Sequence, residues 1–252
     1  MFESVRKISQ ILIKILKVSR LALATTSLDE ILLFPLYGVS KDWSPIKSVE
    51  KSFFTKYPGY ITSIDADMQD KDILESNMNT ILNNTDSKLI EKSFDKSFLG
   101  DPDDQNLFAK LTRGEIQQFR IWENSSHLAF LTPFPNIEYA SVVIPRKHLS
   151  SNILSLDKQN FNDLMAAVYT VINEVLLKAL NIKRVGIIFE GMEIDYAHVK
   201  LYPIDSKNDI INNKTAKYWE KYPGFVTTLK SVKISPTESL NFLHEQLSNC
   251  FD

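Results

Sequence analysis

The chain has 252 residues, of which 44% are hydrophobic and 24% are charged, and its formal net charge is −2 at pH 7. This length can bury a substantial core in one large domain or two small ones, and the composition is that of a globular protein rather than a disordered one. The balanced charge gives no global attraction for a polyanion, so nucleic acid is not an expected partner and any phosphate must be bound locally.

Cysteine content and hydropathy exclude two further classes of protein. The single cysteine, Cys250, permits no intramolecular disulfide bond and no zinc site built from several cysteines. No run of about eighteen apolar residues occurs, so a transmembrane helix is not expected. We therefore expect a cytoplasmic protein.

The first predicted element is a basic amphipathic helix. Its apolar residues recur at helical spacing, with lysine and arginine between them (Ile8, Ile11, Leu12, Ile15 and Leu16). Such a helix can lie on an anionic membrane, or it can pack its apolar stripe against a sheet. Packing against a sheet is the favoured interpretation, because a similar helical segment recurs later in the chain.

A second helix and a linker follow. Residues 71–82 carry an apolar stripe typical of a helix (Ile73, Leu74, Met78, Ile81 and Leu82). The chain is polar and charged between residues 83 and 104, and the stretch from Gly100 to Asp104 breaks any helix. We place a linker at residues 99–104, between a first unit at 1–98 and a second at 105–252.

The second unit predicts mixed helices and strands. It begins with a short helix and continues as a meander of strands to Pro145. A long helix is expected around residues 160–180, with Asp157 as its cap. The motif strand comes next, and a last helix at 237–247 carries its own apolar stripe (Leu240, Phe242, Leu243 and Leu247).

The stretch from Gly191 to Ile204 contains the candidate chemistry. Its side chains alternate with period two, with one polar set (Tyr196, His198, Lys200 and Tyr202) and one apolar set (Ala197, Val199 and Leu201). This pattern predicts a strand that packs one face on a core and presents the other to a cleft. An imidazole next to an ammonium suits a phosphate ligand.

Several segments together resemble a histidine triad domain. The resemblance runs from Phe108 to Leu229 and depends on four stretches before the motif strand (residues 107–116, 121–124, 128–131 and 142–148). The run Tyr-Ala-His-Val-Lys-Leu-Tyr, residues 196–202, falls where the family has H-x-H-x-H. The lysine at its third position is similar to a bacterial subgroup of the family. The resemblance implies an α+β fold, with an antiparallel β-meander sheet packed with helices.

The resemblance also implies an activity. In this family the middle histidine attacks the α-phosphorus of a nucleotide conjugate and forms a nucleotidyl-histidine, which water then resolves. His198 matches that nucleophile, and Lys200 would neutralise a phosphate oxygen. Tyr196 takes the place of the first histidine and cannot relay a proton at neutral pH as histidine does.

Other positions of the family pattern are altered in this chain. Met192, followed by Glu193, stands where the family often has a glutamine that contacts phosphate, and Thr132 stands where many members hold the ribose with a carboxylate. The positions of two zinc-binding cysteines in some members read Asn106 and Ala109. We therefore expect a nucleotide or nucleotide conjugate as ligand, and neither a metal nor another cofactor.

The remaining histidines and basic residues are expected to be structural. His127 and His244 are interpreted as surface residues and His148 as a rim residue, while Arg146 and Lys147 are interpreted as a solvated pair near the end of the cleft. The aromatic residues Trp122 and Phe130 are expected in the core; Phe134, like them, has the ring needed to stack on a base.

The first hundred residues repeat the end of the chain. Lys56-Tyr-Pro-Gly recurs as Lys221-Tyr-Pro-Gly at an offset of 165, Pro35 corresponds to Pro203 at 168, and the first helix corresponds to residues 176–184 at 164. This predicts a partial duplication, in which the N-terminal unit is a degenerate half copy. Glu30 matches His198, so this copy lacks a nucleophile. The half copy would serve as an internal pseudo-partner; alternatively, its open edge would recruit a second chain to form a homodimer.

Two functions are compatible with these residues. The first is a nucleotide-conjugate hydrolase or nucleotidyl transferase that acts through His198. The second is a catalytically impaired nucleotide-binding or scaffold protein, which the replacements Tyr196, Met192 and Thr132 favour. The retained His198 and Lys200 favour the enzyme.

Overall fold

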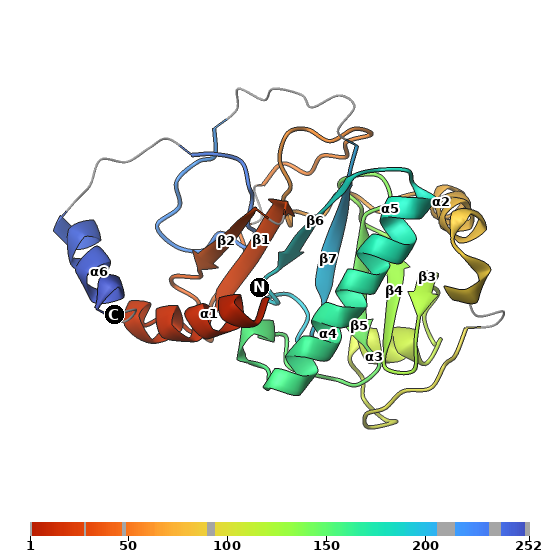
Figure 1. Ribbon diagram of the computed structural model, residues 1–252, viewed down its shortest axis with the longest axis horizontal. Coiled ribbons are helices and arrows are strands. Elements are labelled where there is room, and N and C mark those ends of the chain that lie inside the picture. The colour runs from red at the N-terminus through yellow and green to blue at the C-terminus, as the bar shows by residue number, and fades with distance from the viewer. Residues whose placement is uncertain are drawn as a thin grey trace.

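The computed structural model describes residues 2–27, 29–46, 49–89, 94–205, 215–231 and 238–249. Its centre is one seven-stranded sheet in which every neighbouring pair is antiparallel (Figure 1). The strands, in their order across the sheet, are β2 (Glu30–Pro35), β1 (Leu21–Ser27), β6 (Arg184–Phe189), β7 (Val199–Ile204), β5 (Ser141–Pro145), β4 (His127–Leu131) and β3 (Phe119–Glu123). The predicted α+β class with an antiparallel meander is confirmed.

Helices cover both faces of the sheet. One face carries α1 (Phe2–Leu16) and a long helix that runs from α4 (Lys158–Thr170) through a π-helical turn (Val171–Leu176) into α5 (Leu177–Ala179) (Figure 1). The short helix α3 (Leu107–Thr112) packs on the other face. The remaining helical segments are α2 (Lys71–Asn84), α6 (Glu238–Ser248) and two 3-10 turns (Ser87–Leu89 and Ile153–Ser155).

Polar side chains fix where the main helices begin. The carboxylate of Asp157 accepts a hydrogen bond from the Asn160 backbone N–H (3.0 Å) at the start of α4, as predicted. Asp70 caps α2 in the same way by accepting from the Asp72 N–H (2.8 Å). Asn106, one of the two positions compared with zinc ligands, caps α3.

The expected alternation along the motif stretch is confirmed, but its expected exposure is wrong. Ala197, Val199 and Leu201 lie in the main core beneath α4, whereas Tyr196 and Tyr202 belong to two other buried clusters. The regular strand begins only at Val199. The polar face of this stretch is covered rather than open, because α3 and the loops of the N-terminal half pack on it.

The amphipathic helices follow their predicted stripes with two exceptions. The apolar side of α1 packs against the main core, in agreement with the favoured interpretation. On α2, Leu74 and Ile81 are buried but Ile73 is 46% exposed, so it does not belong to the stripe. On α6, Phe242 is also exposed, and the side chains of Leu240 and Leu243 lie outside the described residues.

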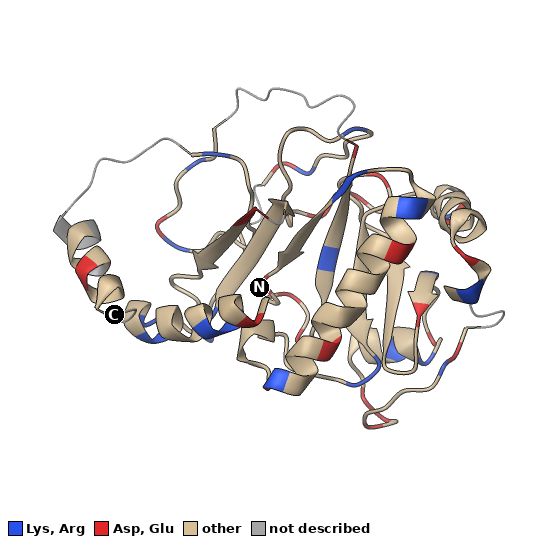
Figure 2. Cartoon of the chain, viewed as in Figure 1, with Lys and Arg blue, Asp and Glu red and all other residues tan. Residues whose placement is uncertain are grey.

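Two surface properties bear on partners. No helix among the described residues is long and apolar enough to cross a membrane. Charged residues of both signs are mixed along the helices and loops (Figure 2), so neither sign dominates the view. This mixture agrees with the small net charge.

Strand β1 extends the sheet of the second half at β6. Ala24 lies opposite Ile188, Leu23 opposite Phe189 and Thr25 opposite Ile187. Ala24 and Ile188 are themselves equivalent at the offset of 164 found in the sequence (188 − 24), and the other two pairs exchange places under the same offset. This register is that of a local two-fold axis between Ala24 and Ile188.

The two hairpins share one register. In the N-terminal hairpin Leu21 lies opposite Pro35, and in the second Val185 lies opposite Pro203. The next three pairs of each hairpin also match when β1 is shifted by 164 residues and β2 by 168. The difference of four residues between these offsets is the amount by which the N-terminal connection is shorter.

The repeated Lys-Tyr-Pro-Gly segments meet side by side. Thr62 forms an isolated antiparallel bridge with Thr227, its own counterpart at an offset of 165 (227 − 62). Six hydrogen bonds of 2.9 to 3.1 Å surround this bridge and form three related pairs, which join residues 61–63 to residues 226–228. Beyond it the tails cross: α2 packs near α5, and α6 packs near α1 (Figure 1).

Candidate functional site

A tight turn brings the motif residues to the sheet. Gly191 has a φ of 66°, and a Cβ atom there would lie 2.2 Å from the Ser151 carbonyl oxygen, so only glycine fits. The guanidinium of Arg20, from the N-terminal half, donates to the carbonyl oxygens of Gly191 and Glu190. The Asp195 carboxylate accepts from the Ser151 hydroxyl (2.8 Å) and completes the loop.

His198 is held as a neutral base. Its Nδ1–H donates to the Tyr196 carbonyl oxygen (2.7 Å), because a carbonyl can only accept. That bond places the proton on Nδ1 and leaves Nε2 as the basic nitrogen, which no described residue hydrogen-bonds. Burial lowers the pKa of His198 to about 4, and the charge of Lys200 lowers it further, whereas the Tyr196 carbonyl opposes the shift. The ring is 7% exposed and packs at 5.3 Å from the Phe108 ring.

Tyr196 contributes its backbone rather than its hydroxyl. The side chain is fully buried, and the hydroxyl donates to the Pro145 carbonyl oxygen (2.7 Å). The ring stacks on His148 with centroids 4.7 Å apart. Burial raises the pKa of Tyr196, so the hydroxyl stays protonated at neutral pH. The phenol is therefore committed to the fold, while the carbonyl of the same residue orients His198.

Lys200 already has an anionic partner. Its ammonium lies 2.8 Å from a carboxylate oxygen of Asp65 and 3.1 Å from the Ser63 carbonyl oxygen, both in the N-terminal half. Burial alone would lower the pKa of Lys200, but the charges of Asp65 and Glu190 outweigh it and raise the pKa. The lysine is thus a cation whose charge is balanced from within the chain.

Little space remains beside this cation. Lys200, Asp65 and Thr132 line a cavity of about 10 Å³, which is the size of about one water molecule. The cleft expected from the sequence is absent at this point of the described structure. Predicted residues Lys200 and Thr132 are nevertheless brought together, as the resemblance implied.

The N-terminal half closes the site. Ala66 and Gln69 donate their backbone N–H groups to the carbonyl oxygens of Phe134 (3.3 Å) and Pro133 (2.9 Å). The Asn136 amide donates to the carbonyl oxygens of Thr62 (2.8 Å) and Ile64 (2.6 Å). Residues 62–69 therefore lie along the stretch that follows Thr132, where the resemblance places the ribose contact.

The other predicted ligand contacts are less central. Met192 is half-buried and packs against the cluster that contains Tyr202, while Glu193 is exposed. The Thr132 hydroxyl accepts from the Phe134 N–H (3.2 Å), so it is engaged in a local turn. Neither Met192 nor Glu193 lines the small cavity.

Sequence reasoning missed four residues around Lys200. Asp65 and Ser63 contact its ammonium, and the Tyr222 hydroxyl donates to the buried side of the site through Glu190. Burial raises the pKa of Glu190, while the charge of Lys200 opposes that rise. Tyr222 lies in a repeated Lys-Tyr-Pro-Gly segment, and Asp65 follows the other repeat by six residues. The repeats were therefore the signal that could have found both.

The interpretation of Arg146 as a solvated residue is wrong. Arg146 and Arg120 are both fully buried, and both donate to the carboxylate of Glu123 (2.7 Å for Arg146). Arg146 also donates to the carbonyl oxygens of Asp95 (2.9 Å) and Ser97 (3.1 Å), which anchors the chain before the predicted linker. Lys147 alone of the predicted pair is exposed.

The other histidines divide into three environments. His127 is buried rather than on the surface, and burial lowers its pKa to about 4. His148 has its ring nitrogens 2.7 Å from Asp104 and 2.6 Å from the Asp195 carbonyl oxygen, so its role is structural, as expected. His244 is exposed on α6. Among the described residues no cluster of three or more histidine, cysteine or acidic side chains is placed to hold a metal ion.

No family model matches the chain. Solved structures of histidine triad proteins are similar to part of it. A Hit-like protein involved in cell-cycle regulation from Bartonella henselae is 27% identical, over 42% of this chain and 85% of that chain, with a TM-score of 0.37. A HIT family protein from Bacillus anthracis is 18% identical, over 59% and 93%, with a TM-score of 0.41. A histidine triad nucleotide-binding protein from Candida albicans is 18% identical, over 58% and 97%, with a TM-score of 0.40.

Proposed function

We propose that this chain is a histidine triad protein that cleaves nucleotide conjugates through a nucleotidyl intermediate on His198. One observation carries the proposal. The Tyr196 carbonyl holds the imidazole proton on Nδ1, and burial keeps the ring neutral, so Nε2 is a basic nitrogen at neutral pH. A histidine kept only for packing needs neither property.

The chemical step follows from this arrangement. Nε2 of His198 forms a bond to the α-phosphorus as the bond from phosphorus to the leaving group breaks, and the electron pair departs with that group. Water then attacks the phosphorus, breaks the nitrogen–phosphorus bond and releases a nucleoside monophosphate. The ammonium of Lys200 would neutralise charge on a non-bridging oxygen during both displacements.

The environment of Tyr196 narrows the substrate class. Its hydroxyl donates to the Pro145 carbonyl oxygen, so it is not available to protonate a leaving group. A polyphosphate departs as a stable anion without receiving a proton, whereas an amine leaves poorly unless it is protonated. We therefore favour a dinucleoside polyphosphate over a nucleoside phosphoramidate as the substrate.

The contact between Asp65 and Lys200 must open before phosphate can bind. Replacing Asp65 with asparagine keeps the side-chain size but removes the competing anion. We expect the Asp65→Asn variant to bind AMP about tenfold more tightly than the wild type, because the phosphate no longer has to displace a carboxylate. Isothermal titration calorimetry with AMP measures this difference.

Asp67 provides the matched control for this substitution. It lies two residues further along the same loop, its side chain is 92% exposed, and its charged contact is with Lys51 at 3.5 Å. Asp67→Asn should leave the affinity for AMP unchanged. Equal affinities for AMP in the wild type and Asp65→Asn would show that Asp65 does not compete with the ligand.

A specific observation also favours the second function, that of an impaired nucleotide-binding or scaffold protein. The phosphate-binding lysine is paired and the cavity beside it is about 10 Å³. If this closed state is permanent, the chain retains the fold without turnover. Turnover of diadenosine tetraphosphate by the Asp65→Asn variant would favour the enzyme, and AMP binding without turnover would favour the impaired protein.

The low pKa of His198 predicts an unusual pH profile. Only the neutral imidazole attacks phosphorus, and the ring loses its proton as pH rises through about 4. Activity, measured as kcat/KM, should therefore stay level from pH 8 down to about pH 5 and fall with an apparent pKa near 4. An acidic limb near the ordinary histidine value of about 6.5 would contradict the buried environment of the ring.

We further infer that residues 1–98 act as the internal pseudo-partner of residues 105–252. The shared hairpin register, the pairing of Ala24 with Ile188 and the paired bonds around Thr62 and Thr227 support this inference. The half copy would then occupy the place of a second subunit. Gel filtration with light scattering should give the mass of one chain, 28.9 kDa. A dimer that persists at low concentration would favour the homodimer instead.

A further inference from the structure

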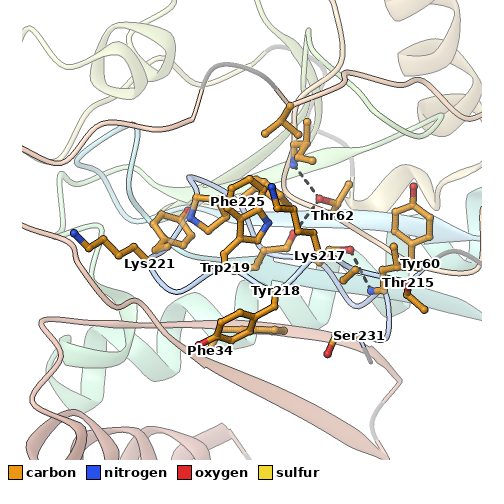
Figure 3. Close-up of a pocket in the computed structure, with 18 of the residues that line it drawn as sticks. Phe34, Tyr60, Thr62, Thr215, Lys217, Tyr218, Trp219, Lys221, Phe225 and Ser231 are labelled. Atoms are coloured by element: carbon orange, nitrogen blue, oxygen red, sulfur yellow. Dashed lines mark hydrogen bonds between the residues drawn. The ribbon is translucent and has the colours of Figure 1, made fainter. Parts of the chain in front are cut away.

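A large groove lies in the N-terminal half, away from His198. It has a volume of about 780 Å³ and runs between the end of β2 and the segment 215–231 (Figure 3). Its walls are rich in aromatic side chains (Phe34, Tyr60, Tyr218, Trp219, Tyr222 and Phe225). Tyr218 is 70% exposed although it contributes to this wall.

The two-fold relation shows which part of the second half corresponds to this groove. There, a crevice of about 10 Å³ is lined by residues of β7 and of the first repeat (Tyr202, Phe54, Pro58, Tyr60, Ile61 and Thr62). Their counterparts at offsets of 168 and 165 all line the groove (Phe34, Trp219, Pro223, Phe225, Val226 and Thr227). The groove and the crevice are therefore equivalent sites of very different size.

Two residues account for much of the difference. Asn136 and Ile137 complete the lining of the small crevice, and they belong to the connection between β4 and β5. The chain provides no counterpart of that connection in its N-terminal half, where the duplication is partial. The crevice is filled in one half, and its equivalent is open in the other.

Asn136 also shows which backbone groups the groove leaves available. Its carbonyl oxygen accepts from the Phe54 N–H (2.8 Å), and its amide donates to the carbonyl oxygens of Thr62 (2.8 Å) and Ile64 (2.6 Å). The equivalent groups in the groove are the N–H of residue 219 and the carbonyl oxygens of residues 227 and 229. No described residue hydrogen-bonds any of these three.

The adjacent sheet edge has the same deficit. In the second half, β5 pairs with the outer edge of β7, with Ser141 opposite Leu201 and Val143 opposite Val199. The equivalent edge of β2 carries no strand among the described residues. An unpaired edge strand is a template for another extended segment.

We propose that β2 and the groove bind an extended segment of a partner polypeptide, which adds a strand to the sheet. The segment would place an asparagine side chain and a β-branched aliphatic residue in the groove, as Asn136 and Ile137 do in the second half. Its continuation, four residues later, would pair with β2 at the positions that Ser141 to Val143 occupy on β7. Backbone hydrogen bonds supply affinity and the amide supplies specificity.

Charge favours a peptide over a phosphate-bearing ligand. The groove is lined by two acidic residues, Glu50 and Glu220, and two basic ones, Lys217 and Lys221, which balance. The Lys217 ammonium lies 4.3 Å from the centre of the Trp219 ring, so part of its charge is already satisfied. A segment with an uncharged backbone fits this lining better than an anion does.

A peptide from this chain tests the proposal. A fluorescein-labelled peptide of residues 134–145 carries the asparagine, the isoleucine and the β5 strand in their natural order. Fluorescence anisotropy with the full-length protein should show saturable binding, with a Kd below about 1 mM. Replacing Asn136 with alanine in the peptide should weaken binding about tenfold, because it removes two hydrogen bonds. N-methylation at Val142 and Val143 should weaken binding as well, because it blocks pairing with the edge of β2.

Two exposed tyrosines of the protein give a matched pair of variants. Tyr218→Ala removes part of the groove wall and should weaken peptide binding, whereas Tyr169→Ala, a 66% exposed residue on α4, should not. Hydrogen exchange should slow in residues 30–35 and 219–229 when the peptide binds. The proposal is overturned if the peptide does not bind, if Asn136→Ala and N-methylation leave its affinity unchanged, or if AMP rather than the peptide protects these residues. None of these outcomes depends on His198.

Discussion

Replacing His198 with alanine is expected to lower kcat/KM for diadenosine tetraphosphate by at least about 10⁴-fold, because removal of a nucleophile eliminates the covalent route. Release of nucleoside monophosphate, followed by chromatography, measures the loss. The wild type and the variant should unfold at similar temperatures, since the ring is held by one hydrogen bond and one aromatic contact.

His244 gives the matched histidine-to-alanine control. It is exposed on α6, and His244→Ala should retain wild-type activity. If His198→Ala still forms product at the wild-type rate, another group attacks the phosphorus and the proposed role of His198 is wrong.

The largest expected loss of stability follows replacement of Glu123 with glutamine. The carboxylate is 3% exposed and balances two guanidinium groups, Arg120 and Arg146, neither of which is exposed at all. Removing this charge leaves two buried cations without their shared partner. We expect the free energy of unfolding to fall by about 3–5 kcal/mol, as is typical when one member of a buried ion pair is deleted. Urea unfolding followed by circular dichroism measures the change.

A surface pair on the same half of the molecule sets the baseline. Glu115 pairs with Arg113 but its side chain is 47% exposed. Glu115→Gln should cost less than about 1 kcal/mol, because solvent screens such a pair. If Glu123→Gln is no more destabilising than Glu115→Gln, the buried cluster does not hold β3, β5 and the segment before residue 99 together.

The fold could be predicted from the sequence because its signals are local. Alternating apolar residues located the core-facing side of β7, and Asp157 marked the start of the long helix. The meander from residue 119 to Pro145 is compact and antiparallel, so neighbouring segments of the sequence are neighbours in the sheet. These features require no knowledge of which distant segments meet.

The closure of the site could not be predicted because it depends on distant contacts. Asp65 and Lys200 are separated by 135 residues, and no local pattern joins them. The same is true of Arg146, which reads as a surface cation until Glu123 and Arg120 are placed beside it. His127 was misjudged for a related reason, since its burial comes from packing rather than from its polar neighbours in sequence.

The internal repeat held more structural information than its individual residues did. The offsets of 164 and 168 agree with the observed registers of both hairpins, and the offset of 165 agrees with the bridge between Thr62 and Thr227. A two-fold relation implies that each tail crosses to the other half. Applied to Asp65, that relation brings the first tail to the site on β7.

The central claim is that His198 becomes covalently nucleotidylated. The most direct measurement is the intact mass of the protein after brief incubation with diadenosine tetraphosphate and an acid-free quench, with peptide mapping of any adduct. The wild type and, to a greater extent, Asp65→Asn should gain the mass of one adenylyl group on His198, and His198→Ala should gain none. An adduct on another residue, or no adduct on Asp65→Asn while AMP is being released, would contradict the account.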